Sequence, residues 1–181
     1  KFNKILAHNQ KYRQWRGIIL TGSEVTLHKD LIALVKQAKA ADFDHVRIQT
    51  HGMHLANKNF CDTLLEAGVD EFFVSVAGSD AKTHDSITAV DKSFEKMMAG
   101  MQYLDNFDHV KLITNTVVTR LSYALLPDIV KALDKLKNLV QMEFWNYWPM
   151  EETDSKNLIA NATDIAPYLL TAIKDAQNLG R

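Results

Sequence analysis

Hydrophobic and polar residues follow two patterns along this chain, one typical of strands and one typical of helices. Segments with the two patterns alternate. Gly17–Thr21 and Glu71–Val76 are short apolar runs typical of buried strands, whereas His45–Thr50 alternates like a strand with one buried face. Between such runs, longer segments place apolar residues at helical spacing, as in Leu27–Ala41. The pattern therefore predicts that strands and helices follow one another in alternation.

The expected helices cover Asn3–Trp15, Leu27–Ala41, Asn57–Ala67, Ser93–Phe107, Leu126–Leu139 and Ile165–Leu179. The expected strands cover Gly17–Thr21, His45–Thr50, Glu71–Val76, Val110–Thr119 and Val140–Trp148. Successive strand starts lie about 26 to 39 residues apart, which suits strand–helix units joined by right-handed crossovers. Apolar strands of this kind indicate a parallel sheet covered by helices. Because no stretch of linker composition interrupts the chain, we expect residues 1–181 to form a single domain.

The composition excludes several classes of protein. Lys and Arg number 21 against 22 Asp and Glu, so the basic surface of a nucleic-acid-binding protein is not expected. The apolar runs are too short to span a bilayer, and no signal peptide is recognisable, so no membrane partner is expected. The single cysteine, Cys61, cannot form an internal disulfide, which suits a reducing compartment and a cytoplasmic location.

Ligands of such a sheet bind where its strands reach their carboxyl ends. The residues at these ends are mostly small hydroxyls and amides with glycines and one carboxylate, in the segments Thr21–Glu24, Thr50–Gly52, Ser75–Gly78, Asn115–Arg120 and Asn146–Trp148. Such side chains suit a polar ligand. They do not include the pair of a nucleophile and an activating base that nucleophilic catalysis needs. The sequence therefore predicts a polar ligand site at this edge of the sheet.

One of these segments carries a resemblance to a known family. Thr21–His28 reads TGSEVTLH and closely resembles the TGGEPTLH stretch of radical S-adenosylmethionine enzymes, with Ser23 and Val25 replacing a glycine and the proline. Further segments resemble the family in the same order: Ile48–Gly52, in which His51 stands where asparagine is usual, Phe73–Gly78, His84–Thr88, Asn115–Thr119 and Phe144–Met150. The resemblance covers most of the chain from Gly17 to Met150.

The resemblance implies an α/β fold, a partial (β/α) TIM-like barrel of about five parallel strands with alternating helices, in which the first strand of the family core is missing. It also implies a core that binds S-adenosylmethionine beside a [4Fe–4S] cluster and generates a 5′-deoxyadenosyl radical. The segment after the first expected strand would cup the methionine amino group, and the later strand ends would hold the carboxylate and the ribose. The candidate S-adenosylmethionine-binding residues are Gly22, Ser23, Glu24, Thr50, His51, Ser75, Asn115 and Thr119.

The family's cluster motif, three cysteines spaced CxxxCxxC, is not found here. Iron–sulfur clusters need thiolate ligands, and Cys61 falls inside an expected helix as a buried small hydrophobe. We therefore expect no metal ligand and no catalytic residue in this chain. Because Lys1 stands where the family's first helix begins, just after the cluster loop, we interpret the chain as a fragment of a radical S-adenosylmethionine enzyme, inactive on its own.

Two other functions stay open at this point. One is a degenerate, non-catalytic binding or scaffold module of the same fold. The other is an ordinary TIM-like lyase or isomerase, in which Glu24 would act as the base and Arg120 as an anion clamp.

The last expected strand is rich in aromatic residues, so one of its faces should pack into the core and the other should line a pocket. The candidate substrate-pocket residues are Asn146, Trp148 and Arg120, and the substrate could be a small molecule or a peptide. Gly17–Thr21 would leave one side of a strand unpaired. We expect self-association through that edge, or cover from the helix at Asn3–Trp15.

Overall fold

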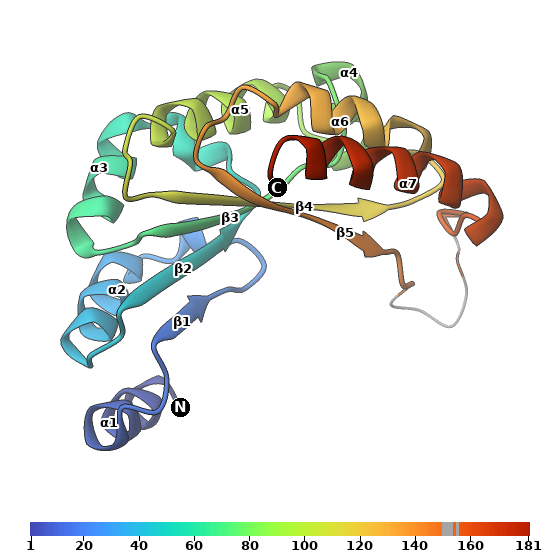
Figure 1. The fold of residues 1–181 in the computed structure, drawn as a ribbon. Helices are drawn as coiled ribbons and strands as arrows, with labels where there is room; N and C mark the ends of the chain where they lie inside the picture. The colour runs from blue at the N-terminus through green and yellow to red at the C-terminus, as the bar shows by residue number, and fades with distance from the viewer. Residues whose placement is uncertain (150–153, 155) are drawn as a thin grey trace.

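The computed structural model describes residues 1–149, 154 and 156–181, and its centre is one five-stranded parallel sheet (Figure 1). The strands are β1 (Gly17–Leu20), β2 (His45–Thr50), β3 (Glu71–Ser75), β4 (Lys111–Val118) and β5 (Leu139–Asn146), and their order in space follows the chain. Every neighbouring pair is parallel. The expected partial TIM-like barrel with alternating helices is confirmed.

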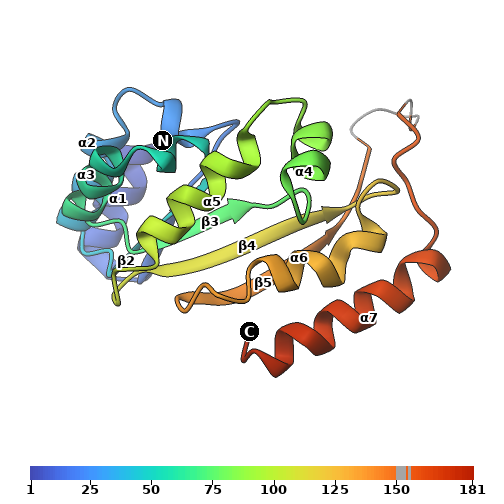
Figure 2. The same cartoon turned by 90° about the horizontal axis from the view of Figure 1, so that it is seen from above.

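The helices after α1 lie along one face of this sheet, as two perpendicular views show (Figures 1 and 2). They are α1 (Phe2–Tyr12), α2 (Leu31–Ala40), α3 (Lys58–Ala67), α4 (Ala81–Thr88), α5 (Ser93–Leu104), α6 (Leu126–Ala132) and α7 (Ala162–Asn178). Three single 3-10 turns join them to strands: η1 (Val25–Leu27), η2 (Met53–Ala56) and η3 (Tyr123–Leu125). No helix among the described residues combines the length and the apolar character needed to cross a membrane.

Two expected helix boundaries were wrong by four or more residues, and hydrogen bonds explain both. The helix expected from Leu27 begins only at Leu31, because the Nδ1 atom of His28 accepts the backbone N–H of Asp30 at 3.2 Å and holds a turn there. The helix expected to reach Leu139 ends at Ala132. The carboxylate of Asp105 accepts the backbone N–H groups of Lys137 and Asn138, at 3.1 and 2.7 Å, and so holds this segment in a turn.

The core lies between the sheet and its helices. Alternate residues of the central strands, including Ile48, Phe72 and Leu112, have no exposed surface. Cys61 is also fully buried, where its thiol donates to the carbonyl of Leu55 at 3.1 Å, and burial raises the pKa of this thiol to about 12. It is thus the small buried hydrophobe that its place in a helix predicts.

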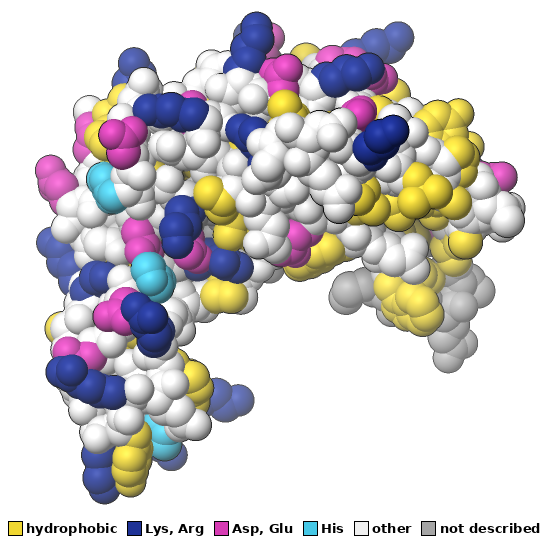
Figure 3. All heavy atoms as spheres, in the orientation of Figure 1, with side chains coloured by type: hydrophobic (Ala, Val, Ile, Leu, Met, Phe, Trp, Pro, Cys, Tyr) yellow, Lys and Arg dark blue, Asp and Glu magenta, His cyan; other side chains and the backbone are white. Residues whose placement is uncertain are grey.

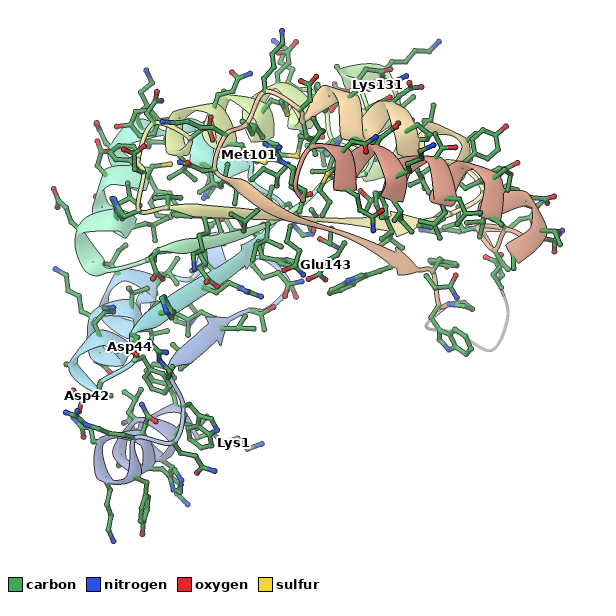
Figure 4. The ribbon with its side chains drawn as sticks, viewed as in Figure 1. Lys1, Asp42, Asp44, Met101, Lys131 and Glu143 are labelled. Atoms are coloured by element: carbon green, nitrogen blue, oxygen red, sulfur yellow. The ribbon has the colours of Figure 1, made fainter. Side chains whose placement is uncertain are left out.

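The other face of the sheet is not covered by helices, and it forms the hollow beneath the arch of the molecule (Figure 3). Near the amino ends of the strands, Glu71 forms ion pairs with Arg47 at 2.9 Å and Lys111 at 3.7 Å. Glu143 lies on the same face (Figure 4) and accepts the indole N–H of Trp145 at 2.6 Å. The hollow therefore combines charged side chains with an aromatic one.

Strand β1 lies at one edge of the sheet and β5 at the other. Helix α1 does not run along the edge of β1; it lies beyond the amino end of that strand (Figure 1). The side chains of Asn9 and Gln10 donate to the carbonyls of Ala41 and Ala40, which anchors α1 to the carboxyl end of α2. Cover of the β1 edge by the first helix, one of the two expectations, is therefore not what the structure has.

Candidate functional site

The carboxylate of Glu24 joins the end of β1 to the end of β2. Its Oε1 atom accepts the backbone N–H of Thr26 at 3.0 Å, and the hydroxyls of Thr26 and Thr50 at 2.6 Å each. Its Oε2 atom accepts the backbone N–H of His51 at 2.7 Å and lies 3.0 Å from the ring atom Nδ1 of the same residue. One side chain therefore orders two of the loops at the candidate site.

These contacts also decide the charge of Glu24. Burial, the largest single influence, raises the pKa of the carboxyl, but the hydrogen bonds from Thr26, Thr50 and the backbone of His51 together outweigh it. The net pKa lies below the ordinary value, so Glu24 is an anion at neutral pH. The arrangement makes Glu24 an unsuitable general base, because its lone pairs are already shared with these donors.

The loop before Glu24 has room for a ligand. A Cβ atom built on Gly22 would meet no atom within 4 Å, so this backbone faces open space. The described residues donate no backbone hydrogen bond to the carbonyl oxygens of Gly22 and Ser23. Free carbonyls beside an ionised carboxylate suit an ammonium group. Gly22, Ser23 and Glu24 therefore form one accessible, electronegative loop.

A cavity of about 420 Å³ opens next to this loop, at the carboxyl ends of β2, β3 and β4. Ser75 and Asn115 are register partners in β3 and β4, and the hydroxyl of Ser75 donates to Oδ1 of Asn115 at 3.0 Å. This bond leaves the amide nitrogen of Asn115 available to a ligand. The cavity is lined by His51, Met53, Ser75, Val76, Ala77, His84, Ile87, Thr88, Val90, Ser93, Asn115, Val117 and Thr119. These lining residues include no Lys, Arg, Asp or Glu.

The eight candidate S-adenosylmethionine residues therefore fall into three places. His51, Ser75, Asn115 and Thr119 line the cavity, and Gly22, Ser23 and Glu24 form the loop beside it. Thr50 is buried below both, where its hydroxyl donates to Glu24 and accepts the backbone N–H of Gly52 at 3.0 Å. Thr119 is also buried, and its hydroxyl accepts the backbone N–H of Leu121, which shapes the turn after β4.

The hydrophobic periodicity of the sequence did not predict α4, although the family resemblance included His84–Thr88. His84 was therefore not among the candidate site residues, and the structure places it in the wall of the cavity. Helix α4 begins where Asp80 accepts the backbone N–H of Thr83 at 2.8 Å. A Cβ atom on Gly78 would lie 2.5 Å from the backbone nitrogen of His84, so only glycine lets α4 close onto the end of β3. The signal in the sequence is Gly78, which lies three residues after the end of β3 and six residues before His84.

The candidate substrate residues lie at the end of β5. Asn146 and Trp148 line a second cavity of about 410 Å³ together with Val118, Ile159 and Ile165. Arg120 is not part of its lining. The guanidinium of Arg120 donates to the carbonyl of Ile159 from Nε and Nη2, at 3.3 and 3.0 Å. These hydrogen bonds connect the segment before α7 to the end of β4. Met150, the last residue of the resemblance, lies outside the described residues.

Fold and site together define an open (β/α) barrel with polar side chains gathered at its strand ends. The model of the Radical SAM superfamily matches residues 2–120, and the chain belongs to this superfamily. An AdoMet-dependent heme synthase of Oleidesulfovibrio alaskensis is 30% identical over 119 residues, which are 66% of this chain and 30% of that protein. A probable GTP 3′,8-cyclase of Methanopyrus kandleri is 29% identical over 124 residues, 68% of this chain and 39% of that protein. The matches span about a third of the length of these relatives.

Solved structures share the fold at low sequence identity. The chain matches anSMEcpe, solved with bound AdoMet and a Kp18Cys peptide, with a TM-score of 0.77 and 17% identity, over 99% of this chain and 53% of that one. It matches coproporphyrinogen III oxidase (HemN) of Escherichia coli, described as a radical SAM enzyme, with a TM-score of 0.69 and 12% identity, over 99% and 44% of the two chains.

The residues of this chain do not fit an iron–sulfur cluster. The cluster needs several thiolates, whereas the 181 residues contain one cysteine, and that cysteine is buried with a raised pKa. The part of the chain that the structure describes holds no group of three or more His, Cys, Asp or Glu side chains placed to bind a metal ion. The residues at the strand ends do fit S-adenosylmethionine, in the open Gly22 loop and the polar pair Ser75–Asn115.

Proposed function

We propose that this chain is the S-adenosylmethionine-binding part of a radical SAM enzyme, and that it binds this molecule at the carboxyl ends of β1 to β4. The observation that supports this most directly is that the Glu24 loop and the Ser75–Asn115 cavity lie side by side, joined through His51. Together they offer an electronegative end for a positive group and a partly apolar cavity for the rest of the ligand.

Each part of the site has a separate role in this proposal. The carbonyls of Gly22 and Ser23, with the ionised Glu24, hold the methionine ammonium group. The amide nitrogen of Asn115 donates to an oxygen atom of the ligand, and the hydroxyl oxygen of Ser75, whose own proton goes to Asn115, accepts from a ligand hydroxyl. Thr50 and Thr119 keep the loops in shape. Bound beside a cluster, S-adenosylmethionine supplies radical SAM enzymes with a 5′-deoxyadenosyl radical.

The cluster itself has no ligands in these 181 residues, so the proposal takes the cysteines to belong to a larger protein. In isolation, the chain binds S-adenosylmethionine without cleaving it. The relatives include a heme synthase and a GTP cyclase, which carry out different reactions according to their names. The proposal therefore concerns S-adenosylmethionine binding and leaves the substrate unassigned.

Protein nuclear magnetic resonance tests this proposal without any turnover. S-adenosylmethionine is titrated into the isotope-labelled chain, and the amide shifts of Gly22–Glu24, His51, Ser75–Gly78 and Asn115–Thr119 should move together. Ser75→Ala and Asn115→Ala should each weaken binding by about 2- to 10-fold, the usual worth of one hydrogen bond. Thr63→Ala, on the exposed face of α3, is the matched control and should leave the affinity unchanged.

Two results would contradict the proposal. One is an absence of shifts at millimolar S-adenosylmethionine in a chain that is folded by its spectrum, which would favour a non-catalytic scaffold. The other is a set of shifts that lies away from the strand ends and is insensitive to Ser75→Ala and Asn115→Ala.

A further inference from the structure

We propose that His84 is a ligand-binding residue of the strand-end cavity, where its Nε2–H group donates a hydrogen bond to an uncharged acceptor on the nucleoside part of the ligand. This inference rests on the proposed function, because it assigns a residue and a ligand group within the same site. It is carried by the tautomer of His84, by the exposure of one ring atom and by the chemistry of the cavity wall.

The tautomer follows from a single contact. The backbone N–H of Ala77 points at Nδ1 of His84 at 3.2 Å, so Nδ1 accepts this bond and carries no proton. Burial lowers the pKa of His84, and the charge of His51 lowers it further. The neighbouring Asp85 raises the pKa, but the net pKa stays below the ordinary value. The ring is neutral at neutral pH, and its one proton sits on Nε2.

His84 lines the cavity although the residue as a whole is 2% exposed. Nε2 has no hydrogen-bond partner among the described residues. Within the same part of the chain, the buried side-chain nitrogen and oxygen atoms that have no partner are Asp154 Oδ1 and Arg181 Nε. Since His84 Nε2 is not one of these sealed atoms, it keeps an accessible surface, and the space that it meets is the cavity that His84 lines.

The chemistry of the cavity wall indicates which part of the ligand lies beside His84. Around His84, the lining side chains Val76, Ile87 and Val90 are apolar, and the described lining residues include no charged Lys, Arg, Asp or Glu. A charged amino-acid group would lose its hydration here without gaining a counter-ion. An uncharged ring or hydroxyl group with an acceptor atom gains both apolar contact and a donor, so the nucleoside part of the ligand fits this wall.

Two substitutions separate the donor from the packing of the ring. His84→Phe keeps a buried ring and removes both nitrogen atoms, whereas His84→Gln places an N–H group near the position of Nε2. Both remove the Nδ1 acceptor of Ala77, so the structural loss is matched between them. Thermal melts and amide spectra of both variants confirm that each is folded before binding is measured.

Binding is measured by calorimetry or by ligand-observed magnetic resonance, with S-adenosylmethionine and with 5′-methylthioadenosine, which lacks the charged amino-acid part. We expect His84→Phe to weaken both ligands by the same factor, about 2- to 10-fold, and His84→Gln to stay within about 2-fold of the wild-type chain.

Each other result has a distinct meaning. Equal affinity of His84→Phe and the wild-type chain overturns the assignment of His84 while leaving the proposed function in place. Equal losses in both variants show that His84 acts only through Ala77, which also overturns it. Weakening of S-adenosylmethionine alone places the contact on the amino-acid part and overturns the choice of ligand group. No binding of either molecule to the wild-type chain overturns the proposed function and this inference together.

Discussion

At the end of β1, Glu24 holds a turn in which the family stretch has the same glutamate followed by a proline. That stretch has a proline where this chain has Val25, and proline fixes the backbone angle φ without needing a partner. Here Val25 opens η1 and is buried, and Glu24 caps the turn by accepting the backbone N–H of Thr26. With valine in place of the proline, this turn depends on the hydrogen bonds to the carboxylate.

This role predicts a pH-dependent loss of stability for Glu24→Gln. The new amide must place an N–H₂ group where the backbone N–H of His51 donates, so one donor loses its acceptor, at a cost of about 1 to 3 kcal/mol in the free energy of unfolding. Because the folded pKa of Glu24 lies below its ordinary value of 4.5, the carboxylate contributes stability above that pH. Its contribution disappears as the pH falls through the folded pKa. Urea unfolding at pH 7 and at about pH 3 measures the difference.

The matched control is Glu66→Gln, on the exposed surface of α3, which should change the free energy of unfolding by less than about 0.5 kcal/mol. If Glu24→Gln were as stable as the wild-type chain at pH 7, or if its deficit did not shrink in acid, Glu24 would not hold these loops together.

At the scale of elements, α5 packs closely against η2. A Cβ atom built on Gly100 of α5 would lie 2.4 Å from Cβ of Leu55 and 2.7 Å from its backbone carbon. Glycine is usually a poor residue inside a helix, by about 1 kcal/mol relative to alanine. Here it lets α5 press against the turn that follows β2 and so supports one wall of the site.

Gly100→Ala should therefore destabilise the protein although alanine is the better helix former. The added methyl group meets backbone atoms, which cannot rotate away, so we expect a loss of about 1 to 3 kcal/mol in the free energy of unfolding. Gln102→Ala, exposed on the same helix, is the control and should be neutral or slightly stabilising. Urea titration of the two variants decides the matter; a more stable Gly100→Ala would mean that the contact with Leu55 is loose.

Elements with strong periodicity were predictable from the sequence, and those held by single hydrogen bonds were not. The strands His45–Thr50 and Glu71–Ser75 agree with their expected bounds to within one residue, because alternation and buried apolar runs fix them. The end of α6 depends on Asp105, which lies on a different βα unit, so no local pattern reveals it. The strand ends could be proposed as a candidate site from the order of the elements, whereas the hydrogen-bond partners of Glu24 and Arg120 could not be predicted.

The whole molecule is an open sheet with two edges, and β1 is the shorter edge strand at four residues. Its outer side meets no other strand within the described chain, and α1 lies below it. Ile19, on the uncovered face of β1, is 54% exposed. Unpaired edge strands of this kind pair with other chains, so we expect the isolated chain to self-associate through β1.

Ile19→Lys should shift the chain toward monomer, because a lysine on an edge strand opposes pairing with a second strand. Sedimentation equilibrium over a range of concentrations measures the change. Val117→Lys places the same charge on the same face of interior strand β4, where Val117 is 41% exposed, and should leave self-association unaltered. Monomeric wild-type chain at all concentrations, or equal dissociation of both variants, would place the contact elsewhere or show that there is none.

The pairing of Trp145 with Glu143 gives this molecule its own optical probe. The indole of Trp145 is 43% exposed over the hollow, its N–H is held by a carboxylate, and its ring centroid lies 5.6 Å from that of Phe73. Indole emission depends on the polarity and the charge around the ring. After Trp15→Phe and Trp148→Phe, fluorescence from Trp145 alone would therefore report any molecule that enters the hollow, and its quenching by iodide would measure how far that molecule shields the face.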